Sequence, residues 1–428
     1  MNWPLLIFGI GFVLIFALRL PIAIGMITVS TFYMLAAGLD ISMVAEKVLS
    51  NLFAKYIIMA VPLFVFTANV MNTGKVTEMV FRFANTLVGR KRGAMGHVNV
   101  LASLIFSGMT GSAVADASGL GIMEIDAMRK QGYEDGFSCA ITAASATIGP
   151  IFPPSIPMVF YAMLSGASIG NLFLGGMAPG VLIALALMVY IAYIARRRNY
   201  PRGEHYSFRE FMRNTLRAAP ALLTPVILLG GIYTGVVTPT EAGALAGFYA
   251  ILISMLVYRA MGPKALWRVI VDTVKATGTL SLIVGASFTF SYVVAIEHIP
   301  DMVARMFLGL TTNRYVFLLL VNVIFLILGM FIDTSTIMVV FVPIVLPAVQ
   351  ALGIDLIHFG VLIVLNMMIG LSTPPFGVLL FIVSGISGAK LEVIIRDIFP
   401  MLIVLVIVLF LITYVPEIVM FIPNTFGR

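Results

Sequence analysis

Long apolar stretches dominate this chain, and its charged residues gather between them. A helix needs about 20 mostly apolar residues to cross the hydrocarbon of a bilayer. The pattern therefore predicts full crossings at roughly residues 4–18, 22–38, 56–72, 136–165, 172–195, 219–236, 242–258, 277–296, 357–388 and 398–422. Segment 75–89 is amphipathic and charged, and we expect it to lie along the cytoplasmic interface.

Two further apolar stretches, 94–128 and 315–350, are interrupted in the middle by small and polar residues. Backbone outside a helix is tolerated at membrane depth only where protein or a water-filled cavity surrounds it. We therefore expect each stretch to form a re-entrant hairpin of two half-depth helices with its tip near the midplane. The fold class that follows is an all-α polytopic membrane protein.

The composition excludes several classes of protein. Of the 428 residues, 61% are hydrophobic and 11% are charged, whereas soluble domains average about 45–50% and about 25%. A soluble enzyme, a disordered chain and a nucleic-acid binder are thereby excluded. One cysteine, Cys139, permits no intrachain disulfide, and the four histidines do not stand at metal-ligand spacing. We expect no cofactor.

The basic residues predict the orientation in the membrane. Clusters at 90–92, 129–130 and 196–198 fall in loops on one side, and cytoplasmic loops of membrane proteins are enriched in Lys and Arg. With those loops inside, five of the 26 Lys and Arg residues lie outside: Lys47, Lys55, Arg305, Arg314 and Arg428. We expect a multi-pass protein of the bacterial inner membrane with both termini in the periplasm.

The second half of the chain repeats the first at a constant offset. When Gly108 is aligned with Gly329, the prolines 153–154 fall on 374–375. The predicted repeats are 1–215, with hairpin 94–128 and broken helix 136–165, and 216–428, with hairpin 315–350 and broken helix 357–388. Each half has an odd number of crossings, so the halves would be inverted, as in many secondary transporters.

The hairpin tips and the broken helices carry the candidate binding residues. Proline lacks an N–H and cannot continue the preceding turn, so each double proline leaves backbone carbonyls free. Carbonyls and hydroxyls are hard oxygen ligands suited to Na⁺, and half-helix N-termini can face a carboxylate. The expected Na⁺ ligands are Ser103, Ser107, Gly108, Ser112, Gly149 and Pro150 in the first half, and Asp333, Thr334, Thr336, Gly370 and Thr373 in the second. The expected substrate contacts are Thr110, Gly111, Pro154, Ser155, Ser335, Ser372 and Pro375.

Each of these assignments has a structural alternative. Any single Gly, Ser or Thr can instead allow close helix packing in the membrane. Carboxylates in apolar segments are costly and mark function by default, which favours Asp333 at its tip, whereas Asp116 can instead cap or hydrogen-bond its own hairpin arm. Glu241 follows Thr238 and Pro239 in the pattern of a helix start, and capping is its expected role.

The sequence resembles the large membrane subunit of tripartite ATP-independent periplasmic (TRAP) transporters, of the DctM/SiaM type and nearest to the sialic-acid branch. The motifs that carry the resemblance are residues 239–242, the hairpin segment 107–112, the segment 149–155 and residues 372–375. The resemblance implies an ion-transporter-superfamily fold and Na⁺-driven, elevator-like import of an organic acid such as sialic acid or a C4-dicarboxylate. Related Na⁺/carboxylate symporters carry Ser-Asn-Thr at a tip where this chain has Gly and Ser, so the ligand sets need not be the same.

The resemblance also implies two partners, a periplasmic substrate-binding protein and a small four-helix membrane subunit of the DctQ/SiaQ type. Because the chain begins directly at its first predicted span, we expect that small subunit to be a separate chain. A self-sufficient Na⁺/carboxylate symporter is the main alternative, and a channel is another. An intramembrane enzyme is disfavoured, because no Ser/His pair or paired catalytic carboxylates stand at workable spacing.

Overall fold

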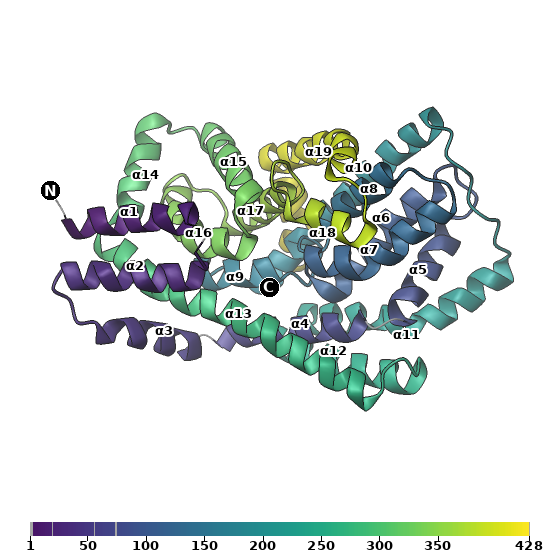
Figure 1. Cartoon of the computed structure of the whole chain (residues 1–428), viewed down its shortest axis with the longest axis horizontal. Helices are drawn as coiled ribbons and strands as arrows, with labels where there is room; N and C mark the ends of the chain where they lie inside the picture. The colour runs from purple at the N-terminus through teal and green to yellow at the C-terminus, as the bar shows by residue number, and fades with distance from the viewer. Residues whose placement is uncertain (1–2, 19, 55, 73–74, 428) are drawn as a thin grey trace.

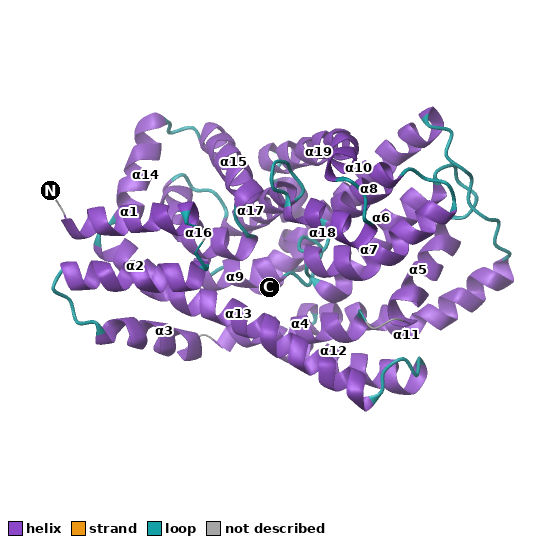
Figure 2. Cartoon of the chain, viewed as in Figure 1, coloured by secondary structure: helices purple, strands orange, loops and turns teal. Residues whose placement is uncertain are grey.

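A computed structural model describes residues 3–18, 20–54, 56–72 and 75–427. Lys55 and Arg428, both expected outside the membrane, lie beyond these residues. Helices joined by loops make up the described chain (Figure 2). The helices of the first half are α1 (Trp3–Ala17), α2 (Ile22–Ala36), α3 (Ser42–Ala54), α4 (Ala60–Met71), α5 (Lys75–Val88), α6 (Ala94–Thr110), α7 (Ala113–Lys130), α8 (Asp135–Ala146), α9 (Ile156–Ser165) and α10 (Ile169–Arg197). Those of the second half are α11 (Phe208–Tyr233), α12 (Pro239–Leu252), α13 (Pro263–Ile296), α14 (Ile299–Leu310), α15 (Arg314–Phe331), α16 (Thr334–Ala351), α17 (Leu356–Leu371), α18 (Val378–Ser387), α19 (Leu391–Tyr414) and α20 (Glu417–Phe426).

Both predicted hairpins are present as pairs of consecutive helices joined by a short turn. α6 and α7 turn at Gly111, whose positive φ of 63° suits glycine, and Ser112 caps α7. α15 and α16 turn at Ile332, and Asp333 caps α16. Each arm has 17 or 18 residues, so a straight arm reaches about 26 Å. The arms are therefore longer than the half-depth helices expected from the sequence.

Each of the two broken helices has one segment that is buried inside the molecule. α8 ends at Ala146 and α9 begins at Ile156, so the first double proline lies in the break; α17 ends at Leu371 and α18 begins at Val378 around the second. Every residue of α8 from Gly136 to Ala146 is buried, as is every residue of α17 from His358 to Leu371. A helix that is apolar on all sides belongs in the interior of its fold.

The offset found in the sequence reappears in the positions where helices begin and end. Gly132 and Gly353 both have positive φ in the turn after a hairpin. Ser112 and Asp333 are the N-caps of the second arms, and Glu134 and Asp355 are the N-caps of the broken helices. This agreement supports a repeat, although the division at residue 215 stays a prediction.

The two halves interlock rather than forming separate bodies. α7 packs against α18, α8 against α19 and α9 against α16, so each hairpin and broken helix touches the other half. α1–α4 and the long helix α13 pack together along one side of the molecule, with α12 and α11 continuing that layer below α5 (Figure 1). The hairpins and broken helices lie in the rest of the body, where they pack against α10, α14 and α19, and contacts between halves build the region of the candidate site.

The helices depart from the predicted spans in a few places. Seven of the described helices are long and apolar enough to cross a membrane by length and composition. α13 begins at Pro263, well before residue 277, and the run 398–422 is divided between α19 and α20. The amphipathic segment is helix α5, as predicted. Glu241 accepts from Thr238 and completes a capping box at the start of α12, which confirms its expected role.

Candidate functional site

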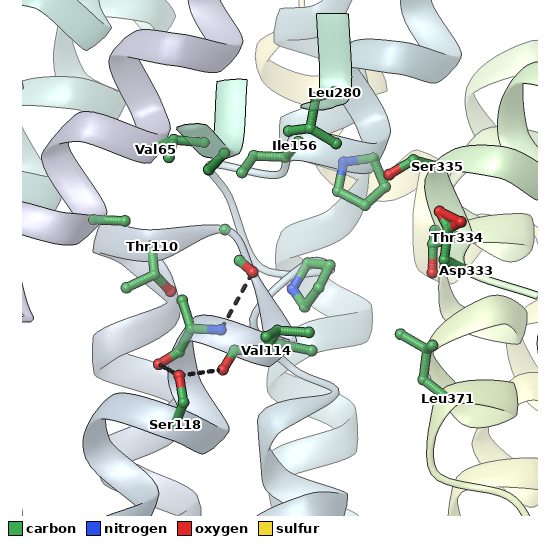
Figure 3. Close-up of a pocket in the computed structure, with 18 of the residues that line it drawn as sticks. Val65, Thr110, Val114, Ser118, Ile156, Leu280, Asp333, Thr334, Ser335 and Leu371 are labelled. Carbon is green, nitrogen blue, oxygen red and sulfur yellow. Dashed lines mark hydrogen bonds between the residues drawn. The ribbon is translucent and has the colours of Figure 1, made fainter. Parts of the chain in front are cut away.

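A cavity of about 450 Å³ lies where the two hairpin tips meet. Figure 3 shows Thr110, Val114 and Ser118 on one side of it and Asp333, Thr334 and Ser335 on the opposite side. Val65 from α4, Leu280 from α13 and Ile156 from α9 complete an apolar wall. The cavity is therefore built by both halves of the chain together with the α4–α13 layer.

In the first half the hairpin tip rests on the broken helix. The N–H of Ile156 faces the carbonyl of Gly111 at 3.5 Å. A Cβ added at Gly111 would lie 2.5 Å from the carbonyl oxygen of Pro154, so a larger residue does not fit. The Ser155 hydroxyl donates to the carbonyl of Pro150 and accepts from the N–H of Met158 at 3.2 Å. The break thus keeps a defined shape beside the tip.

Asp116 lies inside this contact. Its side chain is 2% exposed, and its Oδ1 accepts from the Thr110 hydroxyl at 2.5 Å. Its Oδ2 has no hydrogen-bond partner among the described residues and faces Gly149, where an added Cβ would lie 2.5 Å from that oxygen. A buried carboxylate oxygen without a donor is costly unless a proton or a cation meets it. The expected hydrogen bond within its own hairpin is present, and it leaves one oxygen directed at the break.

In the second half Asp333 begins α16 and faces the cavity. It accepts from the Thr336 N–H at 3.0 Å and from the Thr336 hydroxyl. Thr373 donates to the Ile369 carbonyl at 2.6 Å, within its own broken helix. The Ser372 hydroxyl faces the carbonyl of Ala143 at 3.4 Å and so connects the second break to α8 of the first half.

The predicted site residues divide into those that line the cavity and those outside its lining. The cavity is lined by Thr110, Gly111, Ser112, Pro150, Asp333, Thr334 and Ser335. Outside the lining, in the hairpins and breaks, are Ser103, Ser107, Gly108, Gly149, Pro154, Ser155, Thr336, Gly370, Ser372 and Thr373, together with Pro375, which is exposed. Ser107, for example, donates to the Leu104 carbonyl at 2.6 Å.

Two amides from α4 and the loop that follows it reach the cavity and were missing from the sequence prediction. Asn69 donates to the Thr273 hydroxyl at 3.0 Å, and Oδ1 of Asn72 is buried without a hydrogen-bond partner among the described residues. In the sequence, Asn69 and Asn72 are marked only as amides near the end of an apolar run. Asp333 is the one ionisable side chain among the described residues that line the cavity. Hydroxyls, amides and the N-termini of α7 and α16 are the polar groups available to a ligand there.

Comparisons with known proteins match the chain to a family and a fold. Residues 9–418 match the family model described as "Tripartite ATP-independent periplasmic transporter, DctM component". The chain is 41% identical to the sialic acid TRAP transporter large permease SiaM of Vibrio cholerae over 95% of both chains. It is 38% identical to the C4-dicarboxylate TRAP transporter large permease DctM of Pseudomonas aeruginosa over 87% of both. The solved YdaH transporter of Alcanivorax borkumensis has a similar fold, with a TM-score of 0.66 and 14% identity over 86% of this chain and 87% of that one.

Proposed function

The chain belongs to the DctM family of TRAP transporter permeases, and from this premise we propose that it imports an organic acid together with Na⁺. Relatives named as permeases rather than enzymes support a transport role. Sialic acid and C4-dicarboxylates are the proposed substrate classes, because those are the substrates in the names of two relatives. The cavity between the two hairpin tips is the observation that carries the proposal.

Na⁺ coupling is supported by the oxygen-rich tips and breaks. One Na⁺ site would use the first tip and break, including Ser103, Ser112 and Gly149, and the other would use Asp333, Thr336 and Gly370. Asp116 adds a buried oxygen beside the first break. Hard oxygen ligands at this density suit a hard cation. The hairpins and broken helices would carry substrate and ions across the membrane as a unit, moving against the layer of α1–α4 and α11–α13.

The partners proposed for this chain are a small four-helix membrane subunit and a periplasmic substrate-binding protein. Many large apolar side chains on the proposed stationary layer are exposed, among them Phe32 of α2, Leu216 of α11 and Trp267 of α13. Lipid or a membrane subunit would cover these faces. The alternative to this tripartite arrangement is a symporter that works without the two partners.

The test is uptake into proteoliposomes that contain this chain, with and without the two partners, over a panel of organic acids. We expect saturable uptake only with all three proteins and an inward Na⁺ gradient. Uptake that is unchanged when K⁺ replaces Na⁺, with no proton gradient present, would contradict Na⁺ coupling. Saturable uptake by the chain alone would overturn the tripartite arrangement.

Asp333→Asn tests the second Na⁺ site, and Asp355→Asn is its matched control. Both aspartates are N-caps, and asparagine caps a helix about as well, so neither change should unfold its helix. Removing the charge that faces the cavity should raise the Na⁺ concentration for half-maximal uptake by about tenfold in the Asp333 variant alone. Equal Na⁺ dependence in both variants would make Asp333 a structural residue.

A further inference from the structure

A buried chain of hydrogen bonds connects Glu124 on α7 with Ser103 on α6. Asn99 Nδ2 donates to Glu124 Oε2 at 2.8 Å, and Ser145 Oγ of α8 donates to Asn99 Oδ1 at 2.7 Å. Ser103 Oγ then donates to Ser145 Oγ at 3.1 Å. All four side chains are at most 2% exposed. The state of Glu124 is thereby connected to the hydroxyl of a candidate Na⁺ ligand.

The surrounding groups determine the orientation of the Asn99 amide in this chain. The second amide hydrogen of Asn99 meets Thr142 Oγ1 at 2.7 Å, and Thr142 gives its own hydrogen to the Ser138 carbonyl at 2.9 Å. The reversed amide would place the Asn99 oxygen against the Glu124 carboxyl group and leave both acceptors without a donor. The Asn99 oxygen therefore faces Ser145.

In this arrangement Ser103 donates its hydrogen to Ser145, and its lone pairs remain free to accept. A hydroxyl donates once, and Ser145 Oγ lies 2.7 Å from Asn99 Oδ1 and 3.2 Å from the Thr142 carbonyl. With its hydrogen on either acceptor, Ser145 can only accept from Ser103. Ser145 stands next to Ala146, where α8 ends and the first break begins. Ser103 is thus held beside the break as a pure oxygen acceptor, which is the form in which a hydroxyl binds a cation.

Packing alone does not require a carboxyl group at the position of Glu124. At the offset of the repeat, the second half has Leu320, Ile324 and Val345 where the first half has Asn99, Ser103 and Glu124. Of these, Val345 is buried at 7% exposed and Ile324 is exposed, and the second hairpin bonds to its broken helix at other positions, where Asn366 Nδ2 donates to Asn322 Oδ1 at 2.9 Å. Burying a carboxyl group is costly, and Glu124 Oε1 has no hydrogen-bond partner among the described residues. A role beyond packing accounts for its presence.

We infer that Glu124 is a positioning residue for the first Na⁺ site, holding the Ser103 oxygen ready for the ion through Asn99 and Ser145. The inference rests on the proposed Na⁺ coupling. Groups that orient a metal ligand typically change metal affinity by about 10- to 100-fold when they are removed. Glu124→Leu should therefore weaken Na⁺ binding, while Glu124→Gln, which keeps an oxygen acceptor for Asn99, should preserve it.

The experiment measures binding of radioactive Na⁺ to the purified full chain. We expect Glu124→Leu and Ser145→Ala to raise the half-saturating Na⁺ concentration about tenfold, and Glu124→Gln to stay within about twofold. In the double variant Glu124→Leu/Ser103→Ala, Na⁺ affinity should equal that of Ser103→Ala alone, because both changes act on one ligand. Ser145→Ala, a small change in volume, keeps the test valid if Glu124→Leu does not fold.

The control is Thr413→Val, which breaks the buried bond from Asn322 Nδ2 to Thr413 Oγ1 (2.9 Å) in the second half. It should lower thermal stability and leave Na⁺ affinity unchanged. Wild-type Na⁺ affinity in Glu124→Leu and Ser145→Ala, or additive losses in the double variant, would overturn the inference and leave Na⁺ coupling standing. Absence of Na⁺ binding by the wild-type chain would overturn the proposed coupling itself.

Discussion

At Gly370 the backbone of α17 touches the backbone of α15. A Cβ added there would lie 2.7 Å from the Cα and carbonyl carbon of Gly329, and neither atom can rotate away. We expect Gly370→Ala to lower the free energy of unfolding by about 1–3 kcal/mol, the usual cost of overpacking. Heating the detergent-purified variant and measuring the folded fraction would show this loss.

Gly385→Ala is the matched control for this substitution. Gly385 lies inside α18, and a Cβ there would meet no heavy atom within 4 Å. Alanine is favoured over glycine in a helix by up to about 1 kcal/mol, so this variant should be as stable as the wild type or more so. Equal losses in the two variants would mean that the Gly329–Gly370 contact is not tight.

Single polar residues were predicted from the sequence where a local pattern marked them. Asp333 stands at a break between two apolar arms, and the structure places it at that tip and against the cavity. Asn72, Asn99 and Glu124 lie in or beside apolar helices without a motif. Their partners lie on other helices, far along the chain from them, so only tertiary packing reveals what they contact.

Among the helices, α10, α19 and α8 are joined by Arg198. Its guanidinium makes a two-bond contact with Asp397, at 2.6 and 3.2 Å, and reaches Glu134 at 2.6 Å. The hydrogen bond from Arg198 to Asp397 raises the pKa of the guanidinium above its ordinary value, so the group stays charged at any physiological pH. The clamp joins the ends of two repeat-related helices, one from each half.

Arg198→Ala should destabilise the protein by leaving Asp397, which is 8% exposed, without its partner. Breaking a buried pair costs about 3–5 kcal/mol, and the partial exposure of Arg198 reduces this to about 2 kcal/mol. The control is Arg82→Ala, which removes an exposed pair with Glu78 and should change stability by less than about 1 kcal/mol. Thermal unfolding of both variants compares them, and equal losses would contradict a structural clamp.

The sequence predicted the helices best where the hydropathy is uniform and the helix ends carry recognisable caps. The hairpins, the two breaks and the capped start of α12 were all predicted near their observed positions. The first part of α13 was missed because Lys264, Arg268 and Lys275 lower its hydropathy, although they do not interrupt a helix. Hydropathy reports where a helix is apolar and not where its hydrogen bonds begin.

For the whole molecule, the orientation in the membrane is a prediction that labelling can test. In a Cys139→Ala background, which removes a buried thiol, single cysteines would replace exposed residues in two loops. Thr312→Cys lies between α14 and α15 and His205→Cys between α10 and α11. We expect a membrane-impermeant maleimide to label the first variant in intact spheroplasts and the second only after the cells are opened. The reverse pattern would invert the topology.

The inverted repeat could be inferred from matching glycines and prolines, whereas the interlocking of the halves could not. Contacts such as α7 with α18 and α8 with α19 join segments from opposite halves of the chain. No local pattern encodes which apolar faces meet, because in lipid most faces are equally apolar. The cavity between the two tips therefore appears only once the helices are placed in space.

The chemistry of the cavity wall has a consequence for energy conversion. Asp333 is the ionisable side chain among the described residues that line the cavity. An anion that enters therefore meets no basic side chain there, and the helix N-termini offer only partial positive charge. Under the proposed Na⁺ coupling, mobile cations that enter with the cargo would supply the balancing charge, and an anion-loaded but cation-free carrier would be a high-energy species. If more Na⁺ charges than substrate charges cross the membrane in each cycle, net positive charge moves inward. We then expect the membrane potential, as well as the Na⁺ concentration ratio, to drive substrate accumulation. Because the described residues of the cavity wall include no Lys or Arg, the ion gradient would contribute to the free energy of substrate binding.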